Sequence, residues 1–183
     1  MTVKTRIMTA MAGLFAMLNP GPGIAANDSM QDDMFFATAA RGGMMEVELG
    51  RLAAQKAASQ AVKDFGQRMV TDHGKANQQL QQIAAQKQLR LPGSLPPNMQ
   101  QERDKIAALS GAEFDRMYMS HMVKDHEKDV QEFEKQVEKG KDPEFRAFAE
   151  KTLPVLRQHL ELARSVAAQV GAGHENHGSK SGS

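Results

Sequence analysis

Three histidines and one glutamate in this chain are residue types that bind metal ions, and two of the histidines end a repeated segment. His73 ends the sequence MVTDH and His126 ends the near-copy MVKDH, 53 residues further along. In an amphipathic helix, the Met, Val and His of each copy fall on the apolar side. Glu46 and His159 also fall on the apolar faces of expected helices. All four side chains are therefore expected to face the protein interior.

A buried carboxylate with three neutral imidazoles could bind one divalent ion of the zinc, manganese or iron type. Met69 and Met122 lie one helical turn before His73 and His126, and as optional thioether ligands they would shift the preference toward copper. The alternative is a metal-free cluster in which Glu46 accepts a hydrogen bond from a histidine. The methionines are then adaptable core residues. Because buried histidines are more often core residues than ligands, the sequence alone favours the metal-free cluster.

Asp72 and Asp125 stand directly before the two repeated histidines and allow two interpretations. They could orient an imidazole from behind by accepting its second N–H. Alternatively, they lie at the edge of the apolar face and form weak ion pairs in water with Arg68, Lys75 or Lys128. The sequence favours the ion pairs. It holds no Ser-His-Asp order and no phosphate-binding glycine loop, so no catalytic residue is assigned.

Four long helices are expected to position these groups. Start and stop signals place them from after Ser29 to Ala58, from Gln60 to Lys87, from Phe114 to Lys139 and from Pro143 onward, with a short helix from about Met99 to Leu109. The expected N-caps are Ser29, Ser59, the capping box Ser110-Gly111-Ala112-Glu113 and Asp142. Short joins near residues 59 and 140 predict two antiparallel hairpins, and the proline-rich segment 90–97 predicts a long crossover between them.

The hairpins would bring the four polar groups to one level. Glu46 lies 13 residues before Ser59 and His73 lies 14 after it. His126 lies 15 residues before Lys141 and His159 lies 18 after it, a mismatch of about 4.5 Å at ~1.5 Å per residue. The four side chains are therefore predicted to meet halfway along the bundle.

Three glycines flank Glu46 in the first expected helix: Gly42, Gly43 and Gly50. Each glycine costs about 1 kcal/mol in a helix relative to alanine. Their presence predicts that the backbone of a partner helix packs very close to this face.

The composition favours an exported all-α domain. Ala, Gln, Met, Lys and Glu dominate, and the absence of cysteine excludes disulfides, thiolate metal sites and thiol catalysis. Lys4 and Arg6 precede an apolar run and a small-residue segment that ends at Ala26, which predicts a signal peptide over 1–26. Its apolar run is too short to span a membrane. A single domain over 27–170 and a disordered Gly/Ser-rich tail over 171–183 are expected to follow.

The charge balance excludes one class of partner. Without Lys4 and Arg6, 21 basic side chains stand against 22 acidic ones. A chain with so little net charge does not present the basic surface that binds nucleic acid. No integral membrane insertion is expected either.

Four blocks of sequence resemble a bacterial family: FATAARGGMMEVELGRL (36–52), VKDFGQRMVTDH (62–73), FDRMYMSHMVKDH (114–126) and TLPVLRQHL (152–160). The family is the one catalogued as domain of unknown function 4142. The resemblance implies a ferritin-like antiparallel four-helix bundle and an exported protein, often labelled a predicted outer membrane protein. It implies no established activity. Di-iron sites of ferritin-like proteins use Glu-x-x-His. Here the residue three positions before each histidine is apolar instead of Glu: Val70, Val123 and Leu156. At most a mononuclear centre is therefore expected.

Two function hypotheses follow. The leading one is a periplasmic or secreted helical protein without catalytic activity, a binding or envelope-stress module whose partner would be an envelope protein and which could associate with the outer membrane. The alternative is a mononuclear metal-binding or redox protein that uses Glu46, His73, His126 and His159 to hold one Fe, Cu, Mn or Zn ion, with Met69 or Met122 optional. The sequence leaves the oligomeric state open.

Overall fold

The computed structural model describes residues 22–172, and the regular secondary structure of this part of the chain is five helices, without a strand. Its elements are α1 (Pro22–Lys56), α2 (Gln60–Lys87), α3 (Pro97–Ala107), α4 (Gly111–Lys139) and α5 (Pro143–Gln169). Most of the expected signal peptide, and the tail from residue 173 with His174 and His177, lie outside the described residues. The prediction of an all-α domain is confirmed.

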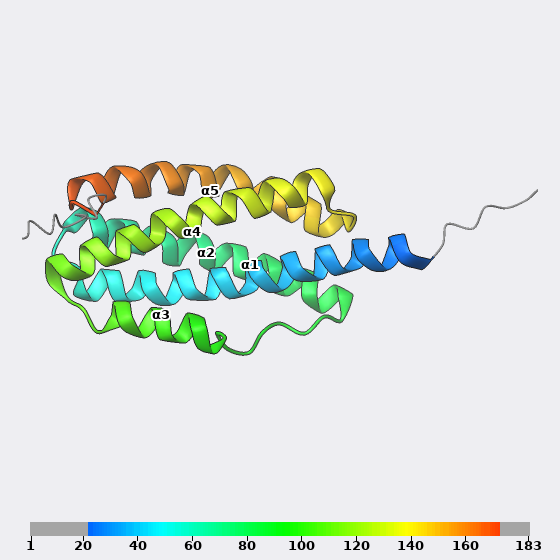
Figure 1. Cartoon of the computed structure of the whole chain (residues 1–183), viewed down its shortest axis with the longest axis horizontal. Helices are drawn as coiled ribbons and strands as arrows, with labels where there is room; N and C mark the ends of the chain where they lie inside the picture. The colour runs from blue at the N-terminus through cyan, green and yellow to red at the C-terminus, as the bar shows by residue number, and fades with distance from the viewer. Residues whose placement is uncertain (1–21, 173–183) are drawn as a thin grey trace, which may run out of the picture.

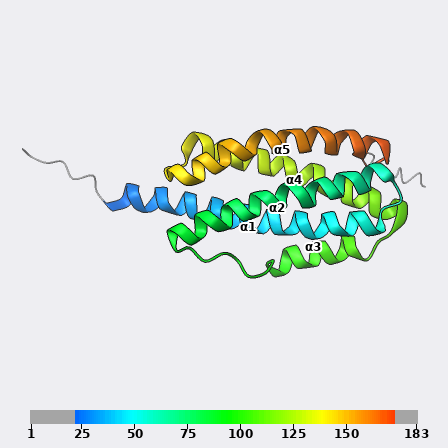
Figure 2. The same ribbon diagram turned by 180° about the vertical axis from the view of Figure 1, so that it is seen from behind.

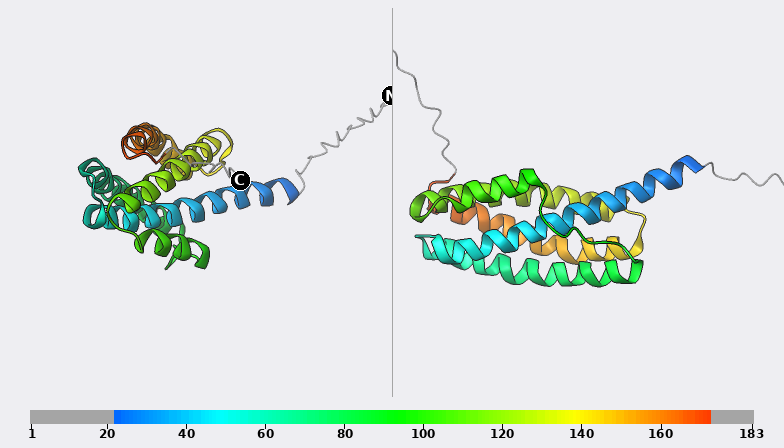
Figure 3. Two further views of the ribbon diagram at one scale, coloured as in Figure 1. Left: turned by 60° about the vertical axis from the view of Figure 1, so that its left-hand side comes forward. Right: turned by 90° about the horizontal axis from the view of Figure 1, so that it is seen from below.

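The four long helices form two antiparallel pairs that pack side by side. Helix α1 pairs with α2 and α4 pairs with α5, while α1 also contacts α4 and α2 contacts α5 (Figures 1 and 2). The short helix α3 lies on the outside, against α1 and α4. The first turns of α1 extend beyond the ends of the other helices (Figure 3). The long connection between α2 and α4 that the sequence predicts is present and carries α3.

Several helix ends agree with the sequence and others do not. The bounds of α2 are as predicted, and Asp142 caps α5 by accepting from the backbone N–H groups of Glu144 and Phe145. Ser59 and Ser110 occupy N-cap positions, but neither side chain makes a capping hydrogen bond, so the predicted capping box is wrong. The predicted start after Ser29 is also wrong. Helix α1 already begins at Pro22, because proline suits the first helical position.

Two buried aspartates connect the hairpins. The carboxylate of Asp115 on α4 accepts from the backbone N–H groups of Ala58 and Ser59, in the turn between α1 and α2. At the other end, the carboxylate of Asp32 on α1 accepts from the N–H groups of Lys141 and Asp142, in the turn between α4 and α5. Each hairpin turn is therefore capped by the opposite hairpin, which explains why the serine side chain at Ser59 is not needed as a cap.

Close backbone packing joins α1 to α2. A Cβ atom added at Gly50 would lie 2.6 Å from the carbonyl oxygen of Gly66, and one added at Gly66 would lie 2.6 Å from Cβ of Ala53. The close approach predicted at Gly50 is confirmed. Gly43 instead faces the side chain of Asn77, and Gly42 faces only the carboxylate of Asp129 at 3.9 Å.

Two apolar clusters fill the interior on either side of a polar layer. The first surrounds Phe65, Met69 and Met122, and the second surrounds Phe35 and Leu156. The residues of the predicted site are buried but belong to neither cluster. The fold therefore places polar side chains where a continuous apolar core would otherwise lie.

Candidate metal centre

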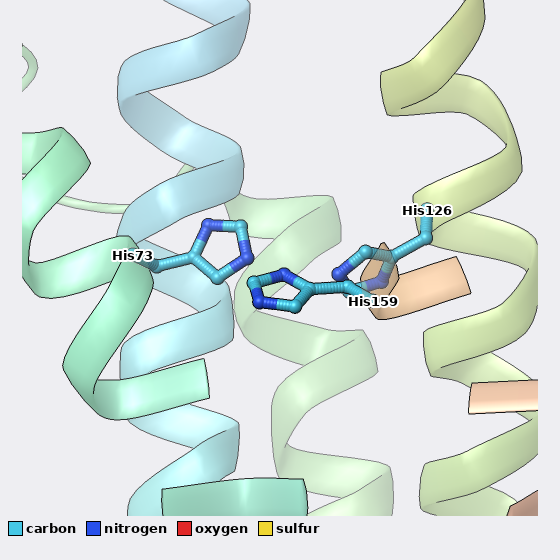
Figure 4. Close-up of side chains that lie close together, drawn as sticks. All are labelled: His73, His126 and His159. Atoms are coloured by element: carbon cyan, nitrogen blue, oxygen red, sulfur yellow. The ribbon is translucent and has the colours of Figure 1, made fainter. Parts of the chain in front are cut away.

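The structure brings together all four side chains that the sequence singles out. Glu46 comes from α1, His73 from α2, His126 from α4 and His159 from α5. Glu46, His126 and His159 have no exposed surface and His73 is 5% exposed. One ring nitrogen of each histidine lies within 4.8 Å of one from each of the others, and the three rings converge from three helices (Figure 4).

Glu46 contacts two of the three histidines. Its Oε2 lies 2.6 Å from Nδ1 of His73, and its Oε1 lies 3.2 Å from Nε2 of His126. Neither oxygen is aligned for a hydrogen bond, and both are buried without a hydrogen-bond partner. The contacts are therefore electrostatic, and the lone pairs of the carboxylate are not satisfied.

Each histidine has an oxygen atom behind it, and for two of the three this oxygen fixes which ring nitrogen carries the proton. Nδ1 of His126 lies 2.9 Å from the carbonyl oxygen of Met122, and Nε2 of His159 lies 3.0 Å from Oδ2 of Asp72. Nδ1 of His73 faces Glu46. Because the carbonyl of Met122 and the carboxylate of Asp72 accept, we assign the N–H to Nδ1 of His126 and to Nε2 of His159. The carboxyl group of Glu46 can donate when protonated and accept when ionised, so it does not fix the proton of His73. Metal-binding histidines are oriented by carboxylates and carbonyls in the same way.

The remaining ring nitrogens have no hydrogen-bond partner. They are Nε2 of His73, Nε2 of His126 and Nδ1 of His159, all buried and without a hydrogen-bond partner. The assigned protons leave Nε2 of His126 and Nδ1 of His159 with a bare lone pair. These nitrogens, Nε2 of His73 and the carboxyl group of Glu46 lie in one layer of the core, and no hydrogen bond within the described residues satisfies them.

The electrostatic environment keeps the histidines neutral. Burial lowers the pKa of His73 and of His159 to about 4, although the nearby carboxylates of Asp125 and Asp72 act in the opposite direction. Burial also lowers the pKa of His126, against the effect of Glu46. Neutral imidazole is the form that binds metal ions.

Burial has the opposite effect on the carboxyl groups. It raises the pKa of Glu46 to about 8, where Asp125 adds to the rise and His126 opposes it. One proton shared between Glu46 and His126 would satisfy those two groups. It would leave Nε2 of His73 and Nδ1 of His159 buried without a partner, so the metal-free cluster predicted from the sequence is not fully hydrogen-bonded.

Asp72 does both things that its sequence position allows: it orients an imidazole and it forms ion pairs at the surface. Its Oδ2 accepts from His159, and the same oxygen lies 3.4 Å from Nε of Arg68, with Lys75 at 3.9 Å from the other oxygen. It therefore orients an imidazole and also forms the expected surface ion pairs. Met69 and Met122 are fully buried within the first apolar cluster, where they act as core residues.

Sequence reasoning missed Asp129. One carboxylate oxygen each of Glu46, Asp125 and Asp129 lie within 4.8 Å of one another. Burial raises the pKa of Asp129 well above its ordinary value, and the charges of Glu46 and Asp125 add to this. The available signal was its position three residues after His126, one helical turn along the same face.

The fold and the site define a class: helical proteins whose core contains a layer of buried histidines and carboxyl groups. The chain belongs to the family described as "Domain of unknown function (DUF4142)", whose model matches residues 19–166. The resemblance inferred from the sequence blocks is thus confirmed. A search of curated proteins finds no match.

Two solved structures share the fold. A DUF305 protein from Streptomyces coelicolor, whose description proposes that it is secreted, has a TM-score of 0.67 at 16% sequence identity and covers 80% of this chain and 98% of its own. A DUF305 fragment from Deinococcus radiodurans has a TM-score of 0.66 at 12% identity, covering 76% and 96%. At this identity the likeness concerns the fold. Within residues 22–172, no helix has the length and apolar character needed to cross a membrane.

Proposed function

We propose that this protein binds one divalent transition-metal ion through His73, His126, His159 and Glu46. The observation that carries the proposal is a buried cluster of three histidines with ring nitrogens within 4.8 Å of one another, two of which contact Glu46. One ring nitrogen of each histidine and both oxygens of Glu46 are buried without a hydrogen-bond partner. Buried polar groups in native proteins are almost always paired. A cation bound between these four groups would satisfy them together, whereas a single proton satisfies only two.

The separations between the groups support this assignment. Oε1 of Glu46 and Nε2 of His126 are 3.2 Å apart, close to the edge of about 3.3 Å expected for a tetrahedron with bonds of roughly 2.0–2.1 Å. The histidine nitrogens, at up to 4.8 Å, must move closer together to reach that edge length. Glu46 and His126 are thus the one pair already at ligand spacing, and a bound ion would draw His73 and His159 toward them.

The ligand set selects among metals. Imidazole nitrogen suits Zn²⁺, Cu²⁺, Fe²⁺ and Ni²⁺, and the order of affinities for such a site rises from Mn²⁺ through Fe²⁺ to Cu²⁺ and falls again at Zn²⁺. We therefore expect Cu²⁺ and Zn²⁺ to bind more tightly than Mn²⁺. The methionines are not needed for this assignment.

The proposed role is metal binding without catalysis. Four protein ligands complete a tetrahedral shell, as in structural zinc sites, whereas catalytic sites keep a position open for water or substrate. This proposal takes the metal-binding alternative from the sequence, without a redox role, in place of the surface-binding module that the sequence favoured. We further infer that its two packed hairpins form a ferritin-like four-helix bundle, and that the chain is exported by its predicted signal peptide to the periplasm or beyond.

The test is metal binding by histidine variants. The protein is purified without a polyhistidine tag, in a background with His174→Ala and His177→Ala so that the tail offers no imidazole. Isothermal titration with Zn²⁺ is expected to give one site per chain. His73→Ala, His126→Ala and His159→Ala should each weaken binding by about 100-fold or more, because loss of a direct ligand exceeds the 10–100-fold effect of groups behind the ligands.

His121→Ala is the matched control. This histidine also lies on α4, but its Nδ1 pairs with Glu102 at 2.9 Å and it is not part of the cluster. Its loss should leave Zn²⁺ affinity unchanged. Equal loss in all four variants, or no binding by the parent protein, would overturn the proposal.

A further inference from the structure

Glu46 belongs to two groups of potential ligands at once. On one side lie the three histidines. On the other side, its carboxylate lies with those of Asp125 and Asp129, with one oxygen of each residue within 4.8 Å of the others. Both aspartates come from α4, on either side of His126, so the helix that presents an imidazole to the inner site also presents two carboxylates beside it.

The carboxylate group contains a buried side chain without a partner. Glu46 has no exposed surface, and neither of its oxygens has a hydrogen-bond partner. Three like-charged groups at this separation repel one another unless protons or a cation lie between them. Lys128 acts on Asp129 from outside, but it leaves the oxygens of Glu46 unpaired.

The aspartates also connect the core to solvent. Asp125 and Asp129 line a groove of about 760 Å³ between α1 and α4, together with Gly42 of α1. Gly42 has no side chain there: a Cβ atom at this position would meet Oδ1 of Asp129 at 3.9 Å. The carboxylates are therefore reachable from outside, whereas Glu46 and the histidines do not line the groove.

We propose that Glu46, Asp125 and Asp129 form a second cation site, next to the histidine site and bridged to it by Glu46. This inference rests on the proposed function, because it assigns Glu46 to both sites. The new site offers only carboxylate oxygens, and water from the groove can complete its shell. Such a site suits a hard divalent cation, Mn²⁺, Mg²⁺ or Ca²⁺, rather than the ions that prefer imidazole.

Mn²⁺ binding to zinc-loaded protein tests the second site. The tail-variant protein is loaded with one equivalent of Zn²⁺ and titrated with Mn²⁺, and the sharp electron paramagnetic resonance signal of free Mn²⁺ reports what remains unbound. One Mn²⁺ per chain is expected to bind. Asp125→Asn and Asp129→Asn should each weaken Mn²⁺ binding at least tenfold while one Zn²⁺ is retained, and circular dichroism checks that each variant is folded.

Glu132→Gln is the matched control, because Glu132 lines the same groove but is not part of the carboxylate group. The charge of Glu132 also acts on Asp129, so this variant should weaken Mn²⁺ binding much less than the tenfold loss expected for the aspartate variants. One bound Zn²⁺ without bound Mn²⁺, or equal loss in the control, would overturn the second site and leave the proposed function standing. If Zn²⁺ does not bind, the proposed function fails. The second site is then upheld if Mn²⁺ binds without Zn²⁺ and the aspartate variants abolish this binding. It is overturned if Mn²⁺ does not bind, or if the aspartate variants bind Mn²⁺ as the parent does.

Discussion

At the scale of single residues, the protonation pattern of the histidines is the main finding. Each imidazole has an oxygen atom behind it, from Met122, Asp72 or Glu46, and at His126 and His159 this oxygen accepts from the ring and leaves the other ring nitrogen with a lone pair. The acceptors are different in kind, but their effect is the same. Replacing one of these acceptors should weaken metal binding by its histidine, because the ring is less well oriented, while the imidazole itself remains.

Asp72→Asn tests this effect. The amide can no longer attract the N–H of His159 with a full charge, so the ring should lose its preferred tautomer and orientation. Zn²⁺ affinity is expected to fall by about 10–100-fold, measured by isothermal titration. Asp64→Asn is the control, because Asp64 lies on the same helix and pairs only with exposed Gln60. An unchanged affinity in Asp72→Asn would contradict the assigned role.

At the scale of elements, the glycines of α1 and α2 allow the backbones to meet. Gly66→Ala is expected to destabilise the fold by about 1–3 kcal/mol, because the new methyl group would overlap Ala53 and the backbone of Gly50. Urea unfolding measures the change.

Gly74→Ala is the control for this prediction. Gly74 lies in the same helix, and an added Cβ atom meets nothing within 4 Å. Alanine there should stabilise the helix by about 0.5–1 kcal/mol. Equal effects at both glycines would mean that the close contact between α1 and α2 does not restrict residue size.

The N-cap of α5 predicts how stability depends on pH. Burial alone would raise the pKa of Asp142, but hydrogen bonds from Lys87 and from the N–H groups of Phe145 and Glu144 outweigh it and hold the pKa below its ordinary value of 3.8. A carboxyl group with a lowered pKa stabilises the fold above its unfolded pKa, and this contribution is lost as the pH falls through the folded pKa.

Asp142→Ala should therefore cost about 0.5–2 kcal/mol at pH 7, and the difference from the parent should shrink as the pH falls below 3.8. Urea unfolding of the variant and the parent, at pH 7 and at a pH below 3.8, measures this difference in the free energy of unfolding. Asp142→Asn keeps a capping oxygen but loses the charge that attracts Lys87, so its loss should be smaller. A cost for Asp142→Ala that is the same at every pH would contradict this explanation.

The sequence predicts much of the helical layout and of the site, for identifiable reasons. The positions of the four polar groups along the bundle follow from the rise per residue of a helix and from where the turns lie. For this reason Glu46 and His73, which are almost equally far from the first turn, are in contact. The side chain of Ser59 does not cap α2, because Asp115, 56 positions away from Ser59, accepts from the N–H groups of that turn instead. Local patterns do not report such distant contacts. Asp129 was missed for a related reason: its position at the edge of an amphipathic face is typical of a solvated acid.

At the scale of the whole molecule, Asp32 and Asp115 hold the two hairpins in register from opposite ends. Asp115→Ala would leave the N–H groups of Ala58 and Ser59 without acceptors, a loss of roughly 1–3 kcal/mol. Asp32→Ala should have a similar effect on the turn at residues 141–142. Because the sites are far apart, the two losses should add to within about 0.5 kcal/mol in the double variant.

Asp33→Ala, at an exposed neighbouring position, is the control for these variants and should change stability by no more than about 0.5 kcal/mol. Urea unfolding again gives the free energies. A double variant no less stable than either single one would show that the two turns are not independent anchors.

The polar layer between two apolar clusters is the central feature of the molecule, and X-ray absorption of the zinc-loaded, tail-variant protein tests its assignment most directly. We predict one Zn²⁺ per chain with a first shell of three imidazole nitrogens and one oxygen, at about 2.0–2.2 Å, and with the outer-shell scattering that imidazole rings produce. A shell of oxygen alone, or an imidazole signal that persists when His73, His126 and His159 are all replaced by alanine, would contradict the account.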